Sequence, residues 1–381
     1  MTANALHAFF VKVPLFSGLS REELDDIVRA VRPVNIPAGQ VIFAEHDAGD
    51  SAYVIQAGHV EVSRRIDGKD VVLARLGPSE VIGELALIDG ASRSATCRTL
   101  EDCTLLRLDK GEFDYLRRNL RPAAYSIIRV IAATIAGRIR ATNEQMAELL
   151  APRRRRRGPR RGAPRGPVQA PVRPREGHAM SQSIEAMGRL PLFKDLTPAE
   201  LQLLSKHLRI RKLAPFQDLF LEGERATGCF VVLGGDVEVF KRLPDGREER
   251  LTLLAPGALV GHLSLVDHRP RSATCKSGIG GARLLELGRD EFDLLFNARN
   301  TFAFKILDHV VNDLAGRLRE TNERLSDARR ARTADQRVAA AKAAGSTLFG
   351  FQIPDSIHGV DLDAIEVEAT TQERATKDRH R

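Results

Sequence analysis

A duplication constrains this chain more than any other feature of its sequence. The segment GELALIDGASRSAT at 83–96 returns as GHLSLVDHRPRSAT at 261–274, 178 positions later. Pro14-Leu15-Phe16 likewise returns at 191–193, and Thr142-Asn143-Glu144 returns at 321–323, so the offset stays between 177 and 179. A repeat of this length is long enough to bury a core of its own. The 381 residues therefore predict two copies of one globular domain.

Each copy has the pattern of a helix, a series of short strands and a long closing helix. Ser20 and Thr197 are each followed three residues later by a glutamate, which is the capping-box signature of a helix start. Short β-branched runs then follow, separated by Gly, Asp and Pro at about the 8–12-residue spacing that is typical of a sandwich or barrel. We expect an α+β fold with domain 1 at 1–150, domain 2 at 181–345 and a C-terminal tail at 346–381.

The basic character of the chain belongs to the connector between the two copies. The net charge is +8, and residues 151–178 hold ten arginines, six prolines, no lysine and one acidic residue, Glu176. Such a segment cannot bury enough apolar surface to fold alone. We therefore expect a disordered Arg/Pro-rich linker at 151–180 between two nearly neutral domains.

The closing helices carry matching apolar stripes. The stripe residues alternate in steps of four and three, the heptad spacing of a two-helix coiled coil. We expect the two helices to pair, either within one chain or in a homodimer; the alternative is that each stripe lies on its own barrel. The stripes consist of Ile128, Ala132, Ile135, Ile139, Thr142 and Met146, and of Leu307, Val311, Leu314, Leu318, Thr321 and Leu325.

Several function classes find no support in the sequence. It contains no Gly-Lys-Ser/Thr loop, nucleophile elbow or carboxylate dyad, so we expect no enzyme and no catalytic residues. His262 and His268 lack the spacing of a metal site, and no metal is expected. With no signal-peptide pattern and no apolar run near 18 residues, we expect no transmembrane segment and a cytoplasmic protein.

The repeated segment has a close counterpart in a known family. Gly83-Glu84-Leu85-Ala86-Leu87, followed by Arg93-Ser94-Ala95-Thr96, resembles the phosphate-binding cassette of cyclic nucleotide-binding domains. It is similar to the cassettes of catabolite activator proteins and of the regulatory subunits of cAMP-dependent protein kinase. The resemblance implies two tandem domains, each a cupin-like jelly-roll β-barrel with flanking helices and a long closing helix.

The resemblance also implies roles for individual residues of the first cassette. Gly83 lets the backbone approach the ligand, and Arg93 offers a planar fork that matches phosphate oxygens. Glu84 would accept the ribose 2′-OH, Ser94 would add a donor to the phosphate, and Leu85 completes the cassette. Thr142 and Asn143 fall where catabolite activators contact adenine. Ser94 favours cAMP as the ligand, with cGMP as the alternative.

The second cassette departs from this pattern. Gly261, Arg271 and Ser272 are retained, but His262 replaces the carboxylate that would accept the 2′-OH. Losing a hydrogen bond to a charged group costs about 1.5–3 kcal/mol. We therefore expect a degenerate second site that is weak, altered in specificity or empty.

These observations predict a regulatory protein that senses a cyclic nucleotide through its first domain and transmits binding by rearrangement of the closing helix. The alternatives are a catabolite-activator-like (CRP-like) transcriptional regulator or a kinase-regulatory-subunit-like protein, although the 36 residues after Gly345 show no helix-turn-helix pattern. A further alternative is a non-sensing scaffold.

The arginine run at Arg153, Arg154, Arg155, Arg156 and Arg157 allows three interpretations. It is a solvated tether, a nonspecific polyanion contact driven by counterion release, or part of a segment at 160–164 that resembles a kinase-inhibitory Arg-Arg-Gly-Ala sequence.

Overall fold

The computed structural model describes residues 3–66, 68–150 and 187–343. The predicted linker at 151–180, its arginine run and the tail at 346–381 lie outside these residues. By its internal contacts the chain divides into two units, Met1–Ser326 and Asp327–Arg381, with the boundary inside the last helix. Both domains and both cassettes belong to the first unit.

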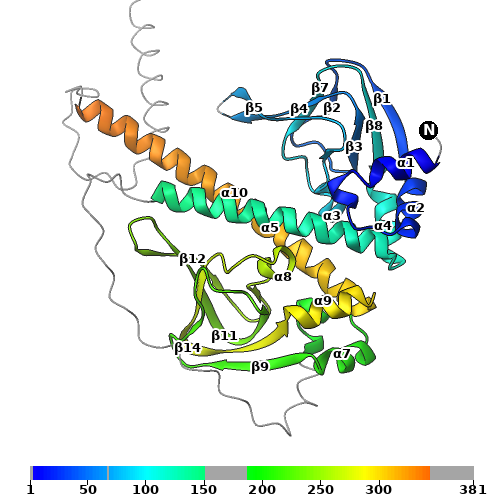
Figure 1. The fold of residues 1–381 in the computed structure, drawn as a ribbon. Coiled ribbons are helices and arrows are strands. Elements are labelled where there is room, and N and C mark those ends of the chain that lie inside the picture. The colour runs from blue at the N-terminus through cyan, green and yellow to red at the C-terminus, as the bar shows by residue number, and fades with distance from the viewer. Residues whose placement is uncertain (1–2, 67, 151–186, 344–381) are drawn as a thin grey trace, which may run out of the picture. The chain divides into compact units, whose positions relative to one another are not determined.

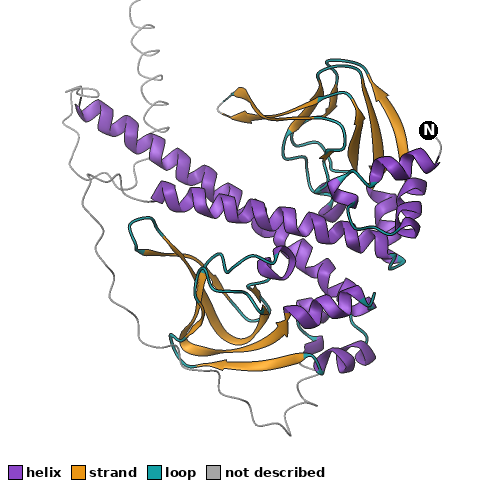
Figure 2. Cartoon of the chain, in the orientation of Figure 1, coloured by secondary structure: helices purple, strands orange, loops and turns teal. Residues whose placement is uncertain are grey.

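The first domain begins with helices and continues into two antiparallel four-stranded sheets (Figures 1 and 2). The sheet orders are β1-β8-β3-β6 and β2-β7-β4-β5. Strands that follow one another in the chain therefore mostly belong to different sheets, as in a jelly roll. Its elements are α1 (Ala3–Phe10), η1 (Pro14–Phe16), α2 (Arg21–Ala30), β1 (Val31–Ile36), β2 (Val41–Phe43), β3 (Ser51–Ala57), β4 (Val60–Ile66), β5 (Lys69–Leu76), β6 (Val81–Ile82), α3 (Ala86–Asp89), β7 (Thr96–Thr99), β8 (Cys103–Asp109), α4 (Lys110–Arg118) and α5 (Pro122–Leu150).

The second domain repeats this order with longer, bent strands. β11 and β14 are each 15 residues long, and each takes the place of two strands of the first domain. Register shifts around Gly234 and Gly235 let β11 bend between the layers. The elements are η2 (Pro191–Phe193), α7 (Pro198–Ser205), β9 (Leu208–Leu213), β10 (Asp218–Phe220), β11 (Gly228–Arg242), β12 (Glu248–Leu254), β13 (Leu259–Val260), α8 (Leu263–Asp267), β14 (Thr274–Gly288), α9 (Arg289–Asn297) and α10 (Thr301–Ala343).

The two predicted helix starts are confirmed. Ser20 and Glu23 form a reciprocal capping box at the start of α2, and Thr197 and Glu200 form one at the start of α7. Each box satisfies two backbone N–H groups that the first helical turn leaves without partners.

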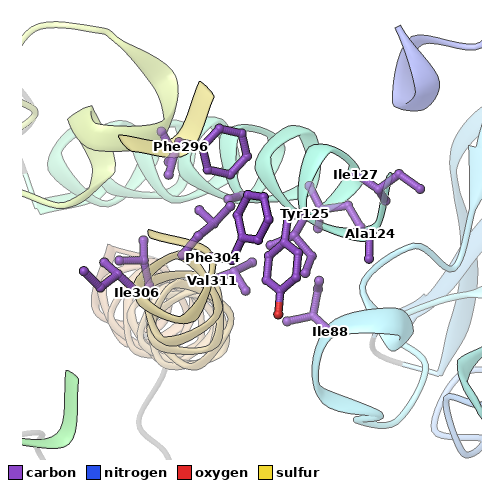
Figure 3. Close-up of a cluster of buried hydrophobic side chains, with 14 of the residues drawn as sticks. Ile88, Ala124, Tyr125, Ile127, Phe296, Phe304, Ile306 and Val311 are labelled. Atoms are coloured by element: carbon purple, nitrogen blue, oxygen red, sulfur yellow. The ribbon is translucent and has the colours of Figure 1, made fainter. Parts of the chain in front are cut away.

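The closing helices α5 and α10 share a buried core (Figure 3). Tyr125 of α5 stacks on Phe304 of α10 with ring centroids 4.3 Å apart, and Phe296 meets Phe304 edge-on at 5.4 Å. Thr142 on α5 also donates a hydrogen bond to the Asn322 side chain on α10 at 3.3 Å. The apolar stripes therefore meet within one chain, as one of the predicted arrangements has it.

Helix α5 bears on the prediction that the chain has no transmembrane segment. By length and composition it could cross a membrane, since it holds an 18-residue window of mean hydropathy 1.2. However, 56% of that window is buried inside the protein. A core helix of this kind passes the same test, so α5 is weak evidence for a membrane span.

Candidate functional site

The first cassette opens onto a cavity of about 350 Å³. Its wall includes the predicted residues Gly83, Glu84, Leu85, Arg93 and Ser94. A volume of this size is within the range of small-molecule sites. The sequence prediction that these five residues lie together is consistent with this geometry.

Arg93 lines this cavity and is held by residues at the start of β3. The residue is 5% exposed, and its Nη1 donates to the Ser51 carbonyl at 2.6 Å. Its Nη2 donates to Asp50 at 3.1 Å, and the guanidinium lies 4.1 Å from the centroid of the Phe43 ring. Gly83 has φ +73°, and a Cβ there would lie 2.5 Å from Arg93 Nη1, so the close approach requires glycine.

The carboxylate of Asp50 balances the charge of this arginine. Burial opposes its ionisation, but the hydrogen bond from Ser51 and the charges of Arg107 and Arg93 outweigh that effect, so the pKa of Asp50 is lowered. Asp50 also pairs with Arg107 at 3.0 Å. The residue that precedes β3 thus supplies a counter-ion to Arg93.

Glu84 joins the cassette to the closing helix of its own domain. Its Oε1 accepts a hydrogen bond from Arg138 of α5 at 2.9 Å, and both residues line the cavity. A ligand that donates a hydrogen bond to Glu84 would therefore compete with Arg138 of α5 for the same carboxylate.

The second cassette opens onto a cavity of about 440 Å³ lined by Gly261, His262, Arg271 and Ser272. Gly261 repeats the positive φ of Gly83, at +71°, and Arg271 is 5% exposed with its guanidinium 4.0 Å from the Phe220 ring centroid. The framework of the cassette is thus the same in both domains.

His262 occupies a buried position beside a carboxylate of the closing helix. Its Nε2 lies 3.0 Å from Asp313 Oδ2, and Asp313 in turn pairs with Arg317 at 2.6 Å. Burial lowers the pKa of His262, against an opposing effect of Asp313. Burial thus disfavours the charged form of the imidazole, whose Nε2 faces the carboxylate.

Each cavity is completed by the closing helix of the other domain. Ala315, Leu318, Arg319 and Asn322 of α10 line the first cavity. Ile139, Arg140 and Asn143 of α5 line the second. Neither set of crossed contacts follows from the sequence of a single repeat.

The decisive comparison is with a family profile. Residues 33–119 and 210–299 each match the family described as "Cyclic nucleotide-binding domain". The chain carries two cyclic nucleotide-binding domains in tandem. The predicted family and fold are both confirmed by this match.

Curated relatives include cAMP-responsive regulators, regulatory subunits of cAMP-dependent protein kinase and cGMP-dependent protein kinases. The cyclic AMP receptor protein of Thermus thermophilus is 36% identical over 33% of this chain and 57% of its own length. The cAMP-dependent protein kinase regulatory subunit of Mycosarcoma maydis is 25% identical over 68% of this chain and 41% of its own length. The chain thus spans roughly half of the length of these relatives.

Among solved structures, the N-terminal domain of a transcriptional regulator from Streptomyces coelicolor A3(2) is 36% identical. That match covers 35% of this chain and 92% of the other, with a TM-score of 0.31.

The predicted adenine contacts of the first cyclic nucleotide-binding domain require a correction. Asn143 lines the second cavity, and Thr142 is absent from the lining of both. The cause is the crossing of the closing helices, which turns Asn143 toward the other domain and brings Asn322, its counterpart 179 positions later, to the first cavity. The repeat offset was the signal that could have identified Asn322.

The described residues hold no cluster of three or more histidine, cysteine, aspartate or glutamate side chains arranged for a metal ion. The four cysteines are all buried as free thiols.

Proposed function

We propose that the first cyclic nucleotide-binding domain is a sensor of cAMP. The observation that carries this proposal is the placement of Arg93 and Glu84 on one small cavity, with the arginine already oriented by Asp50 and Ser51. Arg93 would bind the cyclic phosphate, with Ser94 as an additional donor, and Glu84 would accept the ribose 2′-OH. Relatives named for cAMP and relatives named for cGMP both occur, so the choice of cAMP over cGMP rests on Ser94.

Signal transmission would run through the closing helices. A ribose hydroxyl at Glu84 changes the ion pair of this residue with Arg138, and Arg138 belongs to α5. The same ligand would touch α10 through Asn322, which lines the cavity. Binding would thus alter how the two helices pack, by a differential contact of the kind that any ligand-driven shift requires.

Isothermal titration calorimetry on the full chain tests this function. We expect Arg93→Ala to abolish cAMP binding at the first site, and Glu84→Gln to weaken it by roughly 10- to 100-fold while leaving 2′-deoxy-cAMP nearly unaffected. Cyclic GMP is titrated in parallel, and Arg271→Ala is the matched control in the other domain. Unchanged cAMP binding by Arg93→Ala would contradict the proposal.

The output of the protein is best matched by a regulatory role. A kinase-regulatory-subunit-like function is supported by a relative that aligns across both domains, over 272 residues. The CRP-like relative from Mycobacterium tuberculosis aligns over 137 residues, the span of a single domain. Three points remain predictions: a cytoplasmic location, the domain limits 1–150 and 181–345, and polyanion contact by residues 153–157. We propose no catalytic role.

A further inference from the structure

The two phosphate-binding arginines differ in how their charge is balanced. Both Nη atoms of Arg93 are engaged, and one of them meets the carboxylate of Asp50. Arg271 uses only Nη1, which donates to the Gly261 carbonyl at 3.0 Å and to the Ser264 hydroxyl at 2.9 Å. Among the residues that the structure describes, Arg271 forms no ion pair, whereas Arg93 pairs with Asp50; the buried Nε has no partner in either arginine.

The lack of a counter-ion for Arg271 follows from the residues at the start of β11. Ser51 pairs with Asp109 and Gly228 pairs with Gly288 at the start of the equivalent strands. The positions equivalent to Asp50 and Ser51 are therefore Thr227 and Gly228. The second domain thus has an uncharged threonine where the first has the acid. A Cβ at Gly228 would lie 2.3 Å from the Leu287 carbonyl oxygen, so the hydroxyl of Ser51 has no counterpart there either. Burial lowers the pKa of Arg271, with only partial compensation from more distant groups such as Glu224 and Glu286. An uncompensated buried cation is costly and favours an anionic ligand.

The acidic group of the second cavity has moved rather than disappeared. In the first domain the acid on the cassette, Glu84, pairs with Arg138 of the closing helix. Arg317 is the counterpart of Arg138, 179 positions later, and it pairs with Asp313 on the same helix. His262, at the position of Glu84, lies against Asp313 from the cassette side. Asp313 and Arg317 both line the cavity.

Asp313 stays ionised in this environment. Burial raises the pKa of Asp313, but the contact with His262 and the charge of Arg317 outweigh burial, so the pKa lies well below its usual range. Its side chain is 34% exposed, whereas that of His262 is 3% exposed. The carboxylate rather than the imidazole is therefore the group that a ligand in the cavity can reach.

We infer that the second cavity is a working site for a hydroxyl-bearing phosphate ester, in which Arg271 takes the phosphate and Asp313 replaces the cassette glutamate as the hydroxyl acceptor. The ligand supplies the counter-ion that β11 does not provide. The inference rests on the proposed function only for the choice of a cyclic nucleotide as the probe. It revises the expectation of a weak or empty second site, and it attaches the hydroxyl acceptor directly to the closing helix α10.

The test uses the full chain with one arginine removed at a time. Calorimetry with cAMP on Arg93→Met reports the second site alone, and the same titration on Arg271→Met reports the first. We expect Arg93→Met to bind one cAMP and to prefer it over 2′-deoxy-cAMP by roughly tenfold or more. Adding Asp313→Asn should bring the two affinities to within a few-fold of each other, while Asp313→Glu should keep part of the preference.

Thermal unfolding without ligand provides a second, independent measurement. We expect Arg271→Met to leave the midpoint unchanged or to raise it, because removal of an unpaired buried charge offsets the loss of its hydrogen bonds to Gly261 and Ser264. Arg93→Met should lower the midpoint, because it removes hydrogen bonds to Ser51 and Asp50.

The outcomes separate this inference from the proposed function. If Arg93→Met binds no cAMP at millimolar concentration while Arg271→Met binds one, the second site is overturned and the first domain remains a sensor. A preference for cAMP that survives Asp313→Asn unchanged overturns the assignment of the acceptor. An equal fall of both unfolding midpoints overturns the argument from the missing counter-ion.

Discussion

Replacing Arg140 with methionine should destabilise the protein far more than the same change at Arg319. Arg140 projects from α5 onto the second cassette, where Nε and Nη2 contact both oxygens of Asp267 at 2.6 and 3.1 Å. The side chains are 11% and 5% exposed. Arg319 of α10 makes the equivalent contact with Asp89 of the first cassette, but its side chain is 52% exposed.

The difference in burial sets the magnitudes. Breaking a buried ion pair costs about 3–5 kcal/mol, because one charge is left uncompensated. Asp267 keeps a hydrogen bond from the Arg269 N–H at 3.0 Å, so about 2–4 kcal/mol is expected for Arg140→Met. A largely exposed pair contributes about 1 kcal/mol or less, which is the expectation for Arg319→Met.

Urea denaturation of the two variants, followed by circular dichroism, measures both free energies of unfolding. A double-mutant cycle with Asp267→Asn then isolates the pair, and a coupling of about 1.5 kcal/mol or more is expected. Equal losses for the two arginines, or a coupling near zero at Arg140, would refute the argument that burial of this contact fixes α5 on the second cassette.

Two further outcomes follow from shifted pKa values. The hydrogen bonds from Lys305, Thr197 and Thr301 outweigh burial and lower the pKa of Glu200 to about 2, so its contribution of about 1–2 kcal/mol is fully present above pH 4.5 and is lost as the pH falls toward 2. Glu200→Gln should flatten the dependence of the unfolding free energy on pH in this window, and an unchanged acid profile would contradict the assignment. Burial raises the pKa of Cys97, Cys229 and Cys275 to about 12, so a thiol reagent at pH 8 should label them only on unfolding, and rapid labelling of the native protein would contradict their burial.

The features that could be predicted from the sequence are local or repeated. The cassette glycines and arginines, the capping boxes and the strand-rich middle of each domain depend on residues close together in the chain. The stripes on the closing helices were also visible, because their spacing has the heptad period. Five predicted residues of the first cassette do line one cavity, from Gly83 to Ser94.

The features that could not be predicted depend on how the two helices cross. Asn143 and Asn322 exchange cavities because each helix passes over the other domain, and no spacing within one repeat encodes that crossing. Asp313 escaped notice for a related reason, since Thr134 is its counterpart in the first repeat and carries no charge. A search for the lost glutamate within the cassette could not find an acid that lies 51 residues away.

The exchange of helices gives the two sites a physical basis for coupling. A ligand in the first cavity touches α10, which carries Asp313 and Arg317 of the second cavity. A ligand in the second cavity touches α5, which carries Arg138, the partner of Glu84. If a ligand in one cavity moves the closing helix of the other domain, it therefore also changes the acid–arginine pair of the other site, Glu84–Arg138 or Asp313–Arg317. Because coupling free energies are reciprocal, each ligand must change the affinity of the other by the same factor. If Asp313 accepts the ligand hydroxyl as proposed, the acceptor of the second site belongs to α10, a helix that lines both cavities.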